Sequence, residues 1–94
     1  MLECNTEIIN KLGLHARAAA KLVKLCSGFD SDVNMEKAGR QVNCKSIMGV
    51  MMLAAGCGSK VRITTEGSDE DIAMQAVRDL IEDKFGEDES GEDE

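Results

Sequence analysis

Four short segments of the chain alternate apolar and polar side chains, and three segments with helical periodicity separate or follow them. Alternation with a period of two is typical of strands with one buried face, whereas spacings of three and four are typical of helices with one buried face. The predicted order is strand (2–9), helix (16–26), strand (32–37), strand (40–44), helix (47–54), strand (60–66) and helix (69–85). Since each element has one face to bury, we predict an α+β fold, an open-faced two-layer sandwich with a four-stranded antiparallel sheet covered on one side by three helices.

The spacing of apolar residues also predicts which helix faces are buried. For the first helix the predicted face is Ala16, Ala19, Ala20, Val23 and Cys26 or Leu22. For the last helix it is Ile72, Ala76, Val77, Leu80 and Ile81. Ser68, with Asp71 three residues later, predicts the N-terminal cap of the last helix. Ser46 predicts the cap of the short helix, which we expect to end at Gly56.

The distribution of charge divides the chain into two parts. The net charge is −7, and of the 18 acidic residues six lie in residues 87–94, so the other 12 nearly balance the 11 basic ones. We expect one folded domain at 1–86 and a disordered acidic tail at 87–94, because the tail has no apolar residue to bury. The folded part lacks the basic, aromatic-rich face that nucleic-acid binding requires, since the chain has two Phe and no Trp or Tyr.

Four cysteines, at positions 4, 26, 44 and 57, form no Cys-x-x-Cys pair. Metal sites usually draw on such closely spaced pairs, so we expect no metal and no cofactor, and a redox or metal-binding module is the weaker alternative. The chain shows no secretory signal and no apolar run of the roughly 20 residues that a membrane span needs. We therefore expect a cytoplasmic protein that does not insert into membranes, with buried or half-buried free thiols.

The only histidine lies in the sequence Gly13-Leu14-His15-Ala16-Arg17, directly before a predicted helix. An imidazole nitrogen can accept a phosphoryl group. The start of a helix offers free backbone N–H groups and the positive end of a dipole, and a guanidinium is suited to phosphate oxygens. These properties make His15 a candidate phosphoryl acceptor, with Arg17 and the backbone N–H groups of Ala16, Arg17 and Ala18 as its phosphoryl-binding groups.

Two motifs together resemble the HPr family, the histidine phosphocarriers of the bacterial phosphoenolpyruvate-dependent phosphotransferase system. Residues 13–17 (GLHAR) resemble its phosphohistidine site, and residues 43–51 (NCKSIMGVM) resemble its regulatory serine segment. The resemblance covers residues 2–84. Many members have Pro where this chain has Ala18, and the form without Pro is also similar to the nitrogen-related branch, NPr. Since Pro in a first helical turn only removes an N–H that has no intrahelical partner, Ala18 leaves phosphate binding possible.

The resemblance implies a carrier that is not itself an enzyme. Phosphorylated enzyme I would transfer its phosphoryl group to Nδ1 of His15, and His15 would pass it to an A-type domain of enzyme II or a regulatory homologue. The resemblance also implies phosphorylation of Ser46 by an HPr kinase/phosphorylase, and we expect a monomer. A regulatory binding protein of the same fold, acting mainly through phosphorylated Ser46, is the alternative function.

The resemblance further places a docking patch for these partners around the short helix. The residues it implies are Arg17, Lys24, Lys45, Ile47, Met48 and Met51. Flexible Met side chains suit a surface that binds several partners. We expect Ile47 and Met51 to be partly exposed, and Val50 and Leu53 to be buried.

Overall fold

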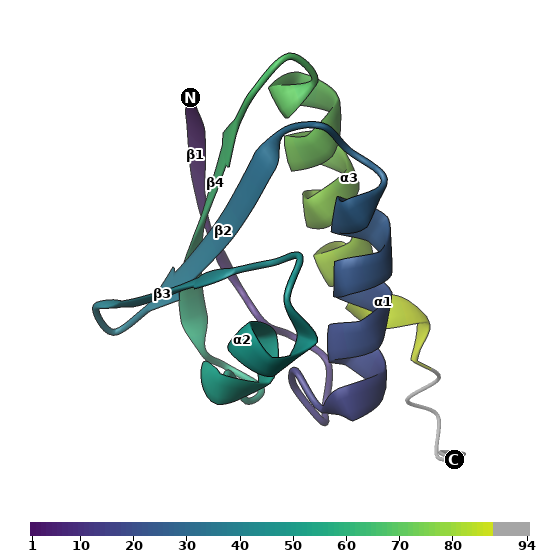
Figure 1. Cartoon of the computed structure of the whole chain (residues 1–94). Coiled ribbons are helices and arrows are strands. Elements are labelled where there is room, and N and C mark those ends of the chain that lie inside the picture. Colours follow the sequence, from purple (N-terminus) through teal and green to yellow (C-terminus); the bar gives the residue numbers. More distant parts are fainter. Residues whose placement is uncertain (88–94) are drawn as a thin grey trace.

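The structure, a computed structural model, describes residues 1–87 and contains four strands and three α-helices in that range (Figure 1). Their bounds are β1 Leu2–Glu7, α1 Ala16–Ser27, β2 Asp32–Lys37, β3 Arg40–Asn43, α2 Ile47–Met52, β4 Lys60–Glu66 and α3 Glu70–Glu82, and a short 3-10 turn, η1, follows at Lys84–Gly86. The predicted order is confirmed, and β2 and β4 have the bounds that the alternation predicts. Within the described residues, no helix is long and apolar enough to cross a membrane.

The strands form one antiparallel sheet in the order β1-β4-β2-β3. The register aligns Cys4, Ile63, Met35 and Val42 across the four strands. Ile63 and Met35, on the two central strands, are fully buried. All three helices cover this face of the sheet (Figure 1), so the predicted open-faced α+β sandwich is confirmed. A two-residue turn at Ala38 and Gly39, both with positive φ, joins β2 to β3 as a hairpin, as the alternation predicts.

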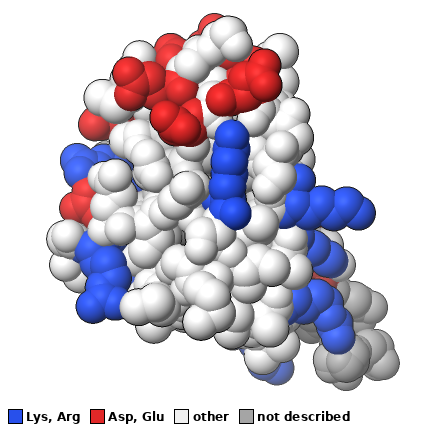
Figure 2. Space-filling view, viewed as in Figure 1, with Lys and Arg blue, Asp and Glu red and all other residues white. Residues whose placement is uncertain are grey.

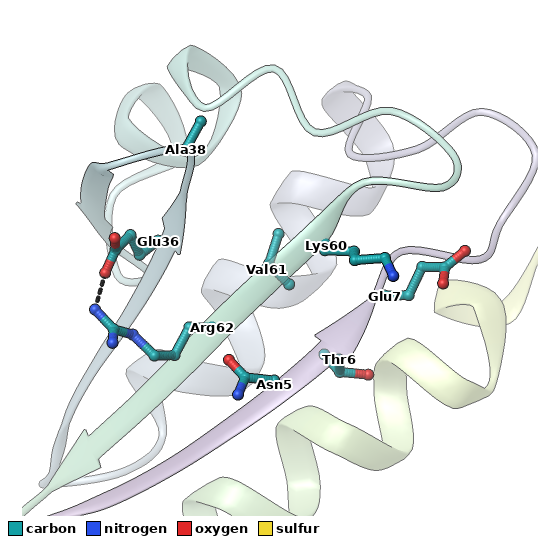
Figure 3. Close-up of a pocket in the computed structure, with 8 residues that line it drawn as sticks. All are labelled: Asn5, Thr6, Glu7, Glu36, Ala38, Lys60, Val61 and Arg62. Carbon is teal, nitrogen blue, oxygen red and sulfur yellow. Dashed lines mark hydrogen bonds and ion pairs between the residues drawn. The ribbon is translucent and has the colours of Figure 1, made fainter.

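The other face of the sheet carries polar side chains and is not covered by a helix (Figure 3). Side chains of β1, β2 and β4 line an open pocket there, in which Arg62 of β4 forms an ion pair with Glu36 of β2. Such a pair contributes about 1 kcal/mol or less because both groups remain in contact with water. This face therefore contributes little to stability, and the fold depends on the opposite, helix-covered face.

The buried face of α1 differs from the predicted one. The structure buries Ala18, Ala19, Leu22 and Cys26, whereas Ala16 and Ala20 are exposed and Val23 is half-buried. Four of residues 16–20 are alanine, so the sequence of the first turns does not indicate which face of α1 is buried. The large side chain of Leu22 decides the orientation instead, because its burial removes the most apolar area from water.

The buried face of α3 is rotated by one residue from the prediction. Ala73, Met74, Val77 and Ile81 are buried, Ala76 and Leu80 are half-buried, and Ile72 is exposed. Two overlapping stripes with spacing four, 72-76-80 and 73-77-81, run along this helix. The sheet buries the second stripe, and the predicted burial of Ile72 is wrong.

Several predicted element ends are also wrong. α3 is capped by Asp69, and its carboxylate accepts hydrogen bonds from the backbone N–H of Asp30 and Ser31 instead of from α3 itself. Ser68 therefore does not form the predicted cap with Asp71. At the other end α3 stops at Glu82, before a backbone with positive φ at residues 84 and 85.

Three other elements end one or two residues before the predicted position. α2 stops at Met52 with Leu53 as its C-cap, and the chain leaves the helix at Ala54, which has a positive φ of 54°. β1 ends at Glu7 and β3 at Asn43, whereas the alternation predicts ends at 9 and 44.

Candidate functional site

His15 is the N-cap of α1, with an extended backbone (φ −77°, ψ 179°) and no capping bond from its side chain. The first intrahelical hydrogen bond runs from the N–H of Ala19 to the carbonyl of His15, at 2.8 Å. In α-helical geometry the N–H groups of residues 16–18 have no acceptor within the helix. The imidazole is 27% exposed. It therefore lies at the surface, next to donors that can bind an anion.

The loop before His15 is fixed by Gly13 and Leu14. Gly13 has a φ of +67°, and a Cβ atom there would lie 2.6 Å from Cα of Gly56 and 2.7 Å from the carbonyl oxygen of Ala55. The N–H of Leu14 donates to that same oxygen at 2.8 Å, and the Leu14 side chain is buried. Close backbone contact with residues 55 and 56 thus holds the loop, and only glycine fits at position 13.

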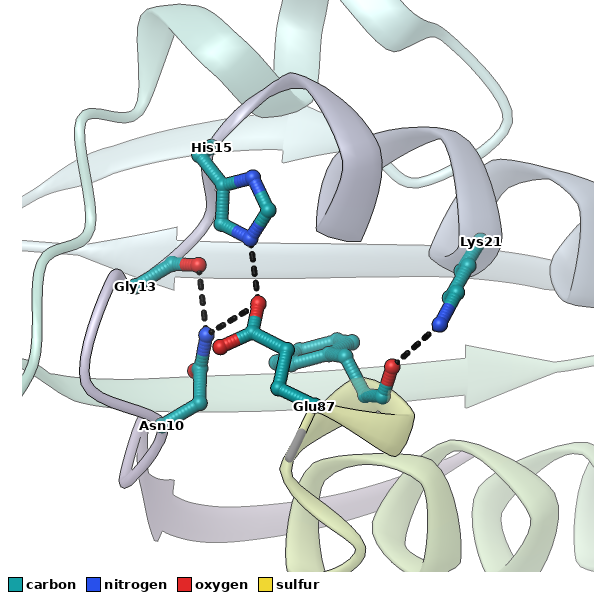
Figure 4. A network of polar contacts seen from close by, with 6 residues as sticks. Asn10, Gly13, His15, Lys21 and Glu87 are labelled. Atoms are coloured by element: carbon teal, nitrogen blue, oxygen red, sulfur yellow. Dashed lines mark hydrogen bonds and ion pairs between the residues drawn. The ribbon is translucent and has the colours of Figure 1, made fainter. Parts of the chain in front are cut away.

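One edge of the imidazole faces a carboxylate from the end of the described chain, and Asn10, in the loop before His15, binds the same carboxylate (Figure 4). Nε2 of His15 is hydrogen bonded to Oε2 of Glu87, and the same oxygen accepts from Nδ2 of Asn10 at 3.1 Å. Asn10 is fully buried, and its Nδ2 also donates to the carbonyl of Gly13 at 2.7 Å. The second ring nitrogen, Nδ1, lies on the opposite edge of the ring, toward α1 (Figure 4).

Glu87 remains charged in this environment. Burial raises the pKa of Glu87, but the hydrogen bonds from His15 and Asn10 and the nearby charge of Lys21 lower it, so that its pKa lies below the ordinary value of 4.5. A carboxylate is therefore present beside the imidazole at neutral pH. Its other oxygen, Oε1, is buried without a hydrogen-bond partner among residues 1–87.

The predicted cations of α1 are exposed. Arg17 and Lys24 lie two turns apart on the helix, and the guanidinium of Arg17 has no hydrogen-bond or ion-pair partner among residues 1–87. Among residues 1–87, nothing thus prevents Arg17 from contacting a ligand at the start of α1. Lys45 is half-buried, and its ammonium donates to the carbonyl of Phe29 at 2.8 Å, which ties it to the loop after α1.

The short helix α2 has the cap and the burial pattern that we predict. Ser46 is its N-cap and accepts a hydrogen bond from the N–H of Gly49 at 3.1 Å. Val50 and Leu53 are buried, whereas Ile47, Met48, Met51 and Met52 are exposed. We call these four exposed side chains the α2 patch.

Basic side chains border the uncharged surface of the α2 patch (Figure 2). The surface over α2 is uncharged, with Lys and Arg along both sides, and the acidic side chains gather at the opposite end of the molecule. Two of the bordering cations belong to the hairpin: Lys37 donates to the carbonyl of Ala54 at 2.9 Å, and Arg40 to that of Met52 at 3.4 Å. Sequence reasoning missed these two residues because nothing in the hairpin sequence indicates that it lies beside α2.

The four thiols are dispersed, apart from one buried pair. Cys26 and Cys44 are fully buried, Cys4 is half-buried, and Cys57 is exposed, contrary to the expectation that every thiol is at least half-buried. The hydrogen bond to Cys26, together with burial, raises the pKa of Cys44. Among residues 1–87, no three His, Cys, Asp or Glu side chains are grouped as a metal ion would require.

The structure thus gathers some of the predicted residues and adds others. His15, the N–H groups of 16–18 and Arg17 lie together at the start of α1, whereas Ser46 and the α2 patch form a separate group on α2. Sequence reasoning missed Asn10 and Glu87. The only signal for Glu87 in the sequence is its position, two residues after the apolar Phe85.

Comparison with known proteins identifies the family. Residues 2–83 match the family model described as "PTS HPr component phosphorylation site". The chain is 61% identical to the phosphocarrier protein HPr of Cupriavidus necator over 87 residues, which cover 93% of this chain and 98% of that protein.

Solved structures agree with this match. The structure is similar to that of HPr from Thermoanaerobacter tengcongensis, with a TM-score of 0.90, 50% identity and coverage of 94% of this chain and 99% of that one. An HPr dimer from the same organism aligns with a TM-score of 0.75 at 50% identity, covering 93% of this chain and 100% of that one. The chain therefore belongs to the HPr family of the phosphotransferase system, and is a phosphocarrier rather than a catalyst.

Proposed function

We propose that Nδ1 of His15 accepts a phosphoryl group from phosphorylated enzyme I and donates it to an A-type domain of enzyme II or a regulatory homologue. In the first step the bond between phosphorus and the donor breaks as the bond to Nδ1 forms. In the second step the bond to Nδ1 breaks, and its electron pair returns to the ring. The partner proteins supply the remaining catalytic groups, and no cofactor takes part.

The observation that carries this proposal is the asymmetry of the imidazole. Nε2 is occupied by Glu87, whereas Nδ1 lies on the edge toward the start of α1 (Figure 4). A phosphoryl group on Nδ1 would face the N–H groups of residues 16–18 and the positive end of the helix dipole. Arg17, exposed in the same turn, adds a charged donor for the phosphoryl oxygens. These contacts stabilise the phosphoryl group by hydrogen bonds and charge alone. Its one covalent bond to the protein is the bond to Nδ1 of His15.

The test is phosphorylation of the purified protein by enzyme I and phosphoenolpyruvate. We expect one phosphoryl group by mass, lost in mild acid, with the phosphorus coupled to Nδ1 in NMR spectra of ¹⁵N-labelled protein. His15→Ala should accept none and still fold, because the His15 side chain makes no capping bond and Glu87 keeps its hydrogen bond from Asn10. An acid-stable phosphate, or one retained by His15→Ala, would contradict the assignment.

We propose that the partners dock on the α2 patch together with Arg17, Lys24 and Lys45. An uncharged surface with cations on both sides complements a partner surface with an apolar centre and acidic borders.

A pair of variants tests this docking surface. Met48 on α2 and Ile72 on α3 are 69% and 66% exposed, so each can be replaced by Asp with little effect on folding. We expect Met48→Asp to raise the KM of enzyme I for the carrier about ten-fold, because a charge in an apolar contact costs more than 1 kcal/mol of binding. Ile72→Asp is the matched control and should leave the KM unchanged. Equal effects of the two substitutions would refute docking on α2.

Ser46 is the proposed regulatory site, modified by an HPr kinase/phosphorylase. It lies at the start of the α2 patch, so a phosphate there would add about two negative charges beside an acidic partner surface. Ser46→Asp should therefore weaken binding of enzyme I, whereas Ser46→Ala should not. If both variants bind enzyme I equally well, charge at this position does not regulate docking.

Two finer points belong to the same proposal. We expect the carrier to act as a monomer, since an α2 patch covered by a second copy could not reach enzyme I. Sedimentation at the concentration of the phosphorylation assay tests this.

The acceptor distinguishes a sugar-transport role from a nitrogen-related role, and transfer to purified A-type domains of each branch identifies it.

A further inference from the structure

The end of the described chain is anchored beside His15. After α3, Lys84 and Phe85 take positive φ values of 57° and 55°, which turns the chain back toward α1. The ring of Phe85 is fully buried in the core, and its carbonyl accepts a hydrogen bond from Nζ of Lys21 at 2.7 Å. We call residues 84–87 the C-terminal hook. These anchors place Glu87, two residues later, at the imidazole (Figure 4).

The contact between Glu87 and His15 is not a loose surface ion pair. The Glu87 side chain is only 10% exposed, and its Oε2 is held by Asn10 as well as by His15. Asn10 is itself fully buried and bonded to Gly13, in the loop that carries His15. Through this carboxylate the C-terminal hook is hydrogen bonded to Asn10, in the loop before α1, and to the imidazole of His15.

A charged carboxylate is costly to bury unless its hydrogen bonds repay the loss of water. Here one oxygen has two donors and the other, Oε1, has no partner among residues 1–87. A surface position would satisfy both oxygens with water. The donors on Oε2, His15 and Asn10, outweigh the burial and keep Glu87 charged, so the carboxylate is built into the site beside the imidazole.

We propose that Glu87 is a positioning residue for phosphoryl transfer: as a carboxylate it accepts the Nε2–H of His15 and thereby holds the ring orientation and leaves the lone pair on Nδ1. This inference rests on the proposed function and adds a residue to it. In a histidine, the hydrogen bond made by one ring nitrogen determines which nitrogen carries the proton. With the proton on Nε2, Nδ1 is the nucleophile.

The proton and charge balance of the transfer is simple. When the bond from Nδ1 to phosphorus forms, the proton stays on Nε2 and the ring becomes cationic. The Glu87 carboxylate lies against that Nε2–H and stabilises the positive charge. When the phosphoryl group leaves, the bonding electrons return to Nδ1 and the ring is neutral again, with the proton still on Nε2. No additional base or proton donor is needed on this chain.

Three variants separate this role from a merely structural one. Glu87→Ala removes the acceptor, and Glu87→Gln keeps a neutral acceptor of the same size. Glu82→Gln, at the exposed C-terminal end of α3, is the matched control because it removes one negative charge away from the imidazole. Far-UV circular dichroism verifies that each variant folds.

The first readout needs no partner enzyme. The ¹⁵N shifts of the two His15 ring nitrogens, at a pH at which the ring is neutral, report the tautomer. We expect Nε2–H in the parent protein and in Glu82→Gln, a measurable share of Nδ1–H in Glu87→Ala, and an intermediate share in Glu87→Gln. Identical shifts in all four proteins would overturn the inference.

The second readout is phosphorylation by enzyme I with the carrier as varied substrate. Glu87→Ala should lower the turnover about ten-fold, the lower end of the effect of removing the outer partner of a metal-bound histidine, with little change in KM. Glu87→Gln should recover part of the loss. An unchanged or faster turnover in Glu87→Ala would refute the role in transfer.

Failure of the proposed function gives a different result from failure of this inference. If the parent protein accepts no phosphoryl group from active enzyme I, both the proposed function and the role of Glu87 in transfer are wrong. The ¹⁵N shifts still decide, in that event, whether Glu87 holds the ring.

Discussion

Replacing Gly13 by Ala should destabilise the fold and displace His15 at the same time. The backbone φ of +67° is unfavourable for a residue with a Cβ atom, and the new Cβ would lie 2.6 Å from Cα of Gly56 and 2.7 Å from the carbonyl oxygen of Ala55. Neither contact can be relieved by rotating a side chain, because both atoms belong to the backbone. One loop must therefore move away from the other.

The size of the effect follows from two separate contributions. A left-handed backbone costs a residue with a Cβ atom about 1–2 kcal/mol. Forcing an extra carbon into a packed contact costs about 1–3 kcal/mol. The expected loss is therefore about 2–5 kcal/mol, a large share of the roughly 5–15 kcal/mol by which small domains are stable.

Gly58 provides a matched control. It also has a positive φ, of +90°, but a Cβ atom there would meet nothing within 4 Å. Gly58→Ala thus has the backbone cost without the steric overlap, and both variants gain the same small stabilisation from a less flexible unfolded chain. We expect Gly13→Ala to be less stable than Gly58→Ala by about 1–3 kcal/mol.

Urea unfolding followed by far-UV circular dichroism measures this difference, since the chain has no Trp or Tyr for a fluorescence signal. Phosphorylation by enzyme I provides the second measurement. The carbonyl of Ala55 that the new Cβ would displace is the acceptor for the N–H of Leu14, next to His15. Gly13→Ala should therefore be phosphorylated more slowly than Gly58→Ala. Equal stability of the two variants would refute the argument from close backbone contact.

Three further changes test other parts of the structure. Ser46→Ala removes the capping bond to the N–H of Gly49 and should cost about 1 kcal/mol in urea unfolding, and an unchanged midpoint would show that α2 does not need its cap. Phe85→Ala leaves a cavity in the core and should cost about 3–5 kcal/mol, whereas a loss below 1 kcal/mol would mean that the C-terminal hook is not anchored by the ring. The hydrogen bond from Ser31, followed by those from backbone N–H groups, lowers the pKa of Asp69 from 3.8. Its contribution to stability is therefore present above pH 3.8 and is lost as the pH falls through the lower, folded-state value. Asp69→Asn should lose less stability over that acidic range than the parent protein, and parallel acid-unfolding curves would contradict this.

The strands are the part of the fold that the sequence predicts best. In β2 and β4 every second residue faces inward, and most of these residues are large and apolar, such as Met35 and Ile63; turn residues border each run. A shift of the register by one residue would expose all of these side chains at once, so no other register has a similar free energy. The helices are less determined, because an alanine-rich turn or two adjacent apolar stripes allow neighbouring orientations of similar energy. The choice between them depends on the shape of the sheet, which the helical sequence does not contain.

The candidate site shows the same distinction between local and distant information. The position of His15 before a helix is encoded within five residues of sequence, and the structure places it at the N-cap of α1. The partner of its Nε2 is 72 residues away, and no local pattern relates the two. Residues that act together across the fold become visible only when the chain is assembled.

Glu87 shows what composition alone leaves out at the end of a folded domain. Six of residues 87–94 are acidic and none is apolar, so the sequence suggests a solvated tail from its first acid onward. The structure instead describes Glu87 as half-buried and paired, and residues 88–94 lie outside the described residues. The deciding residue is Phe85, because a buried ring fixes the chain and two further residues extend only about 7 Å. A charged residue within that reach of a buried aromatic lies close enough to the core to pair with a group there, as Glu87 does with His15. The edge of such a domain is therefore better placed from the last apolar residue that can be buried than from the first residue of a charged run.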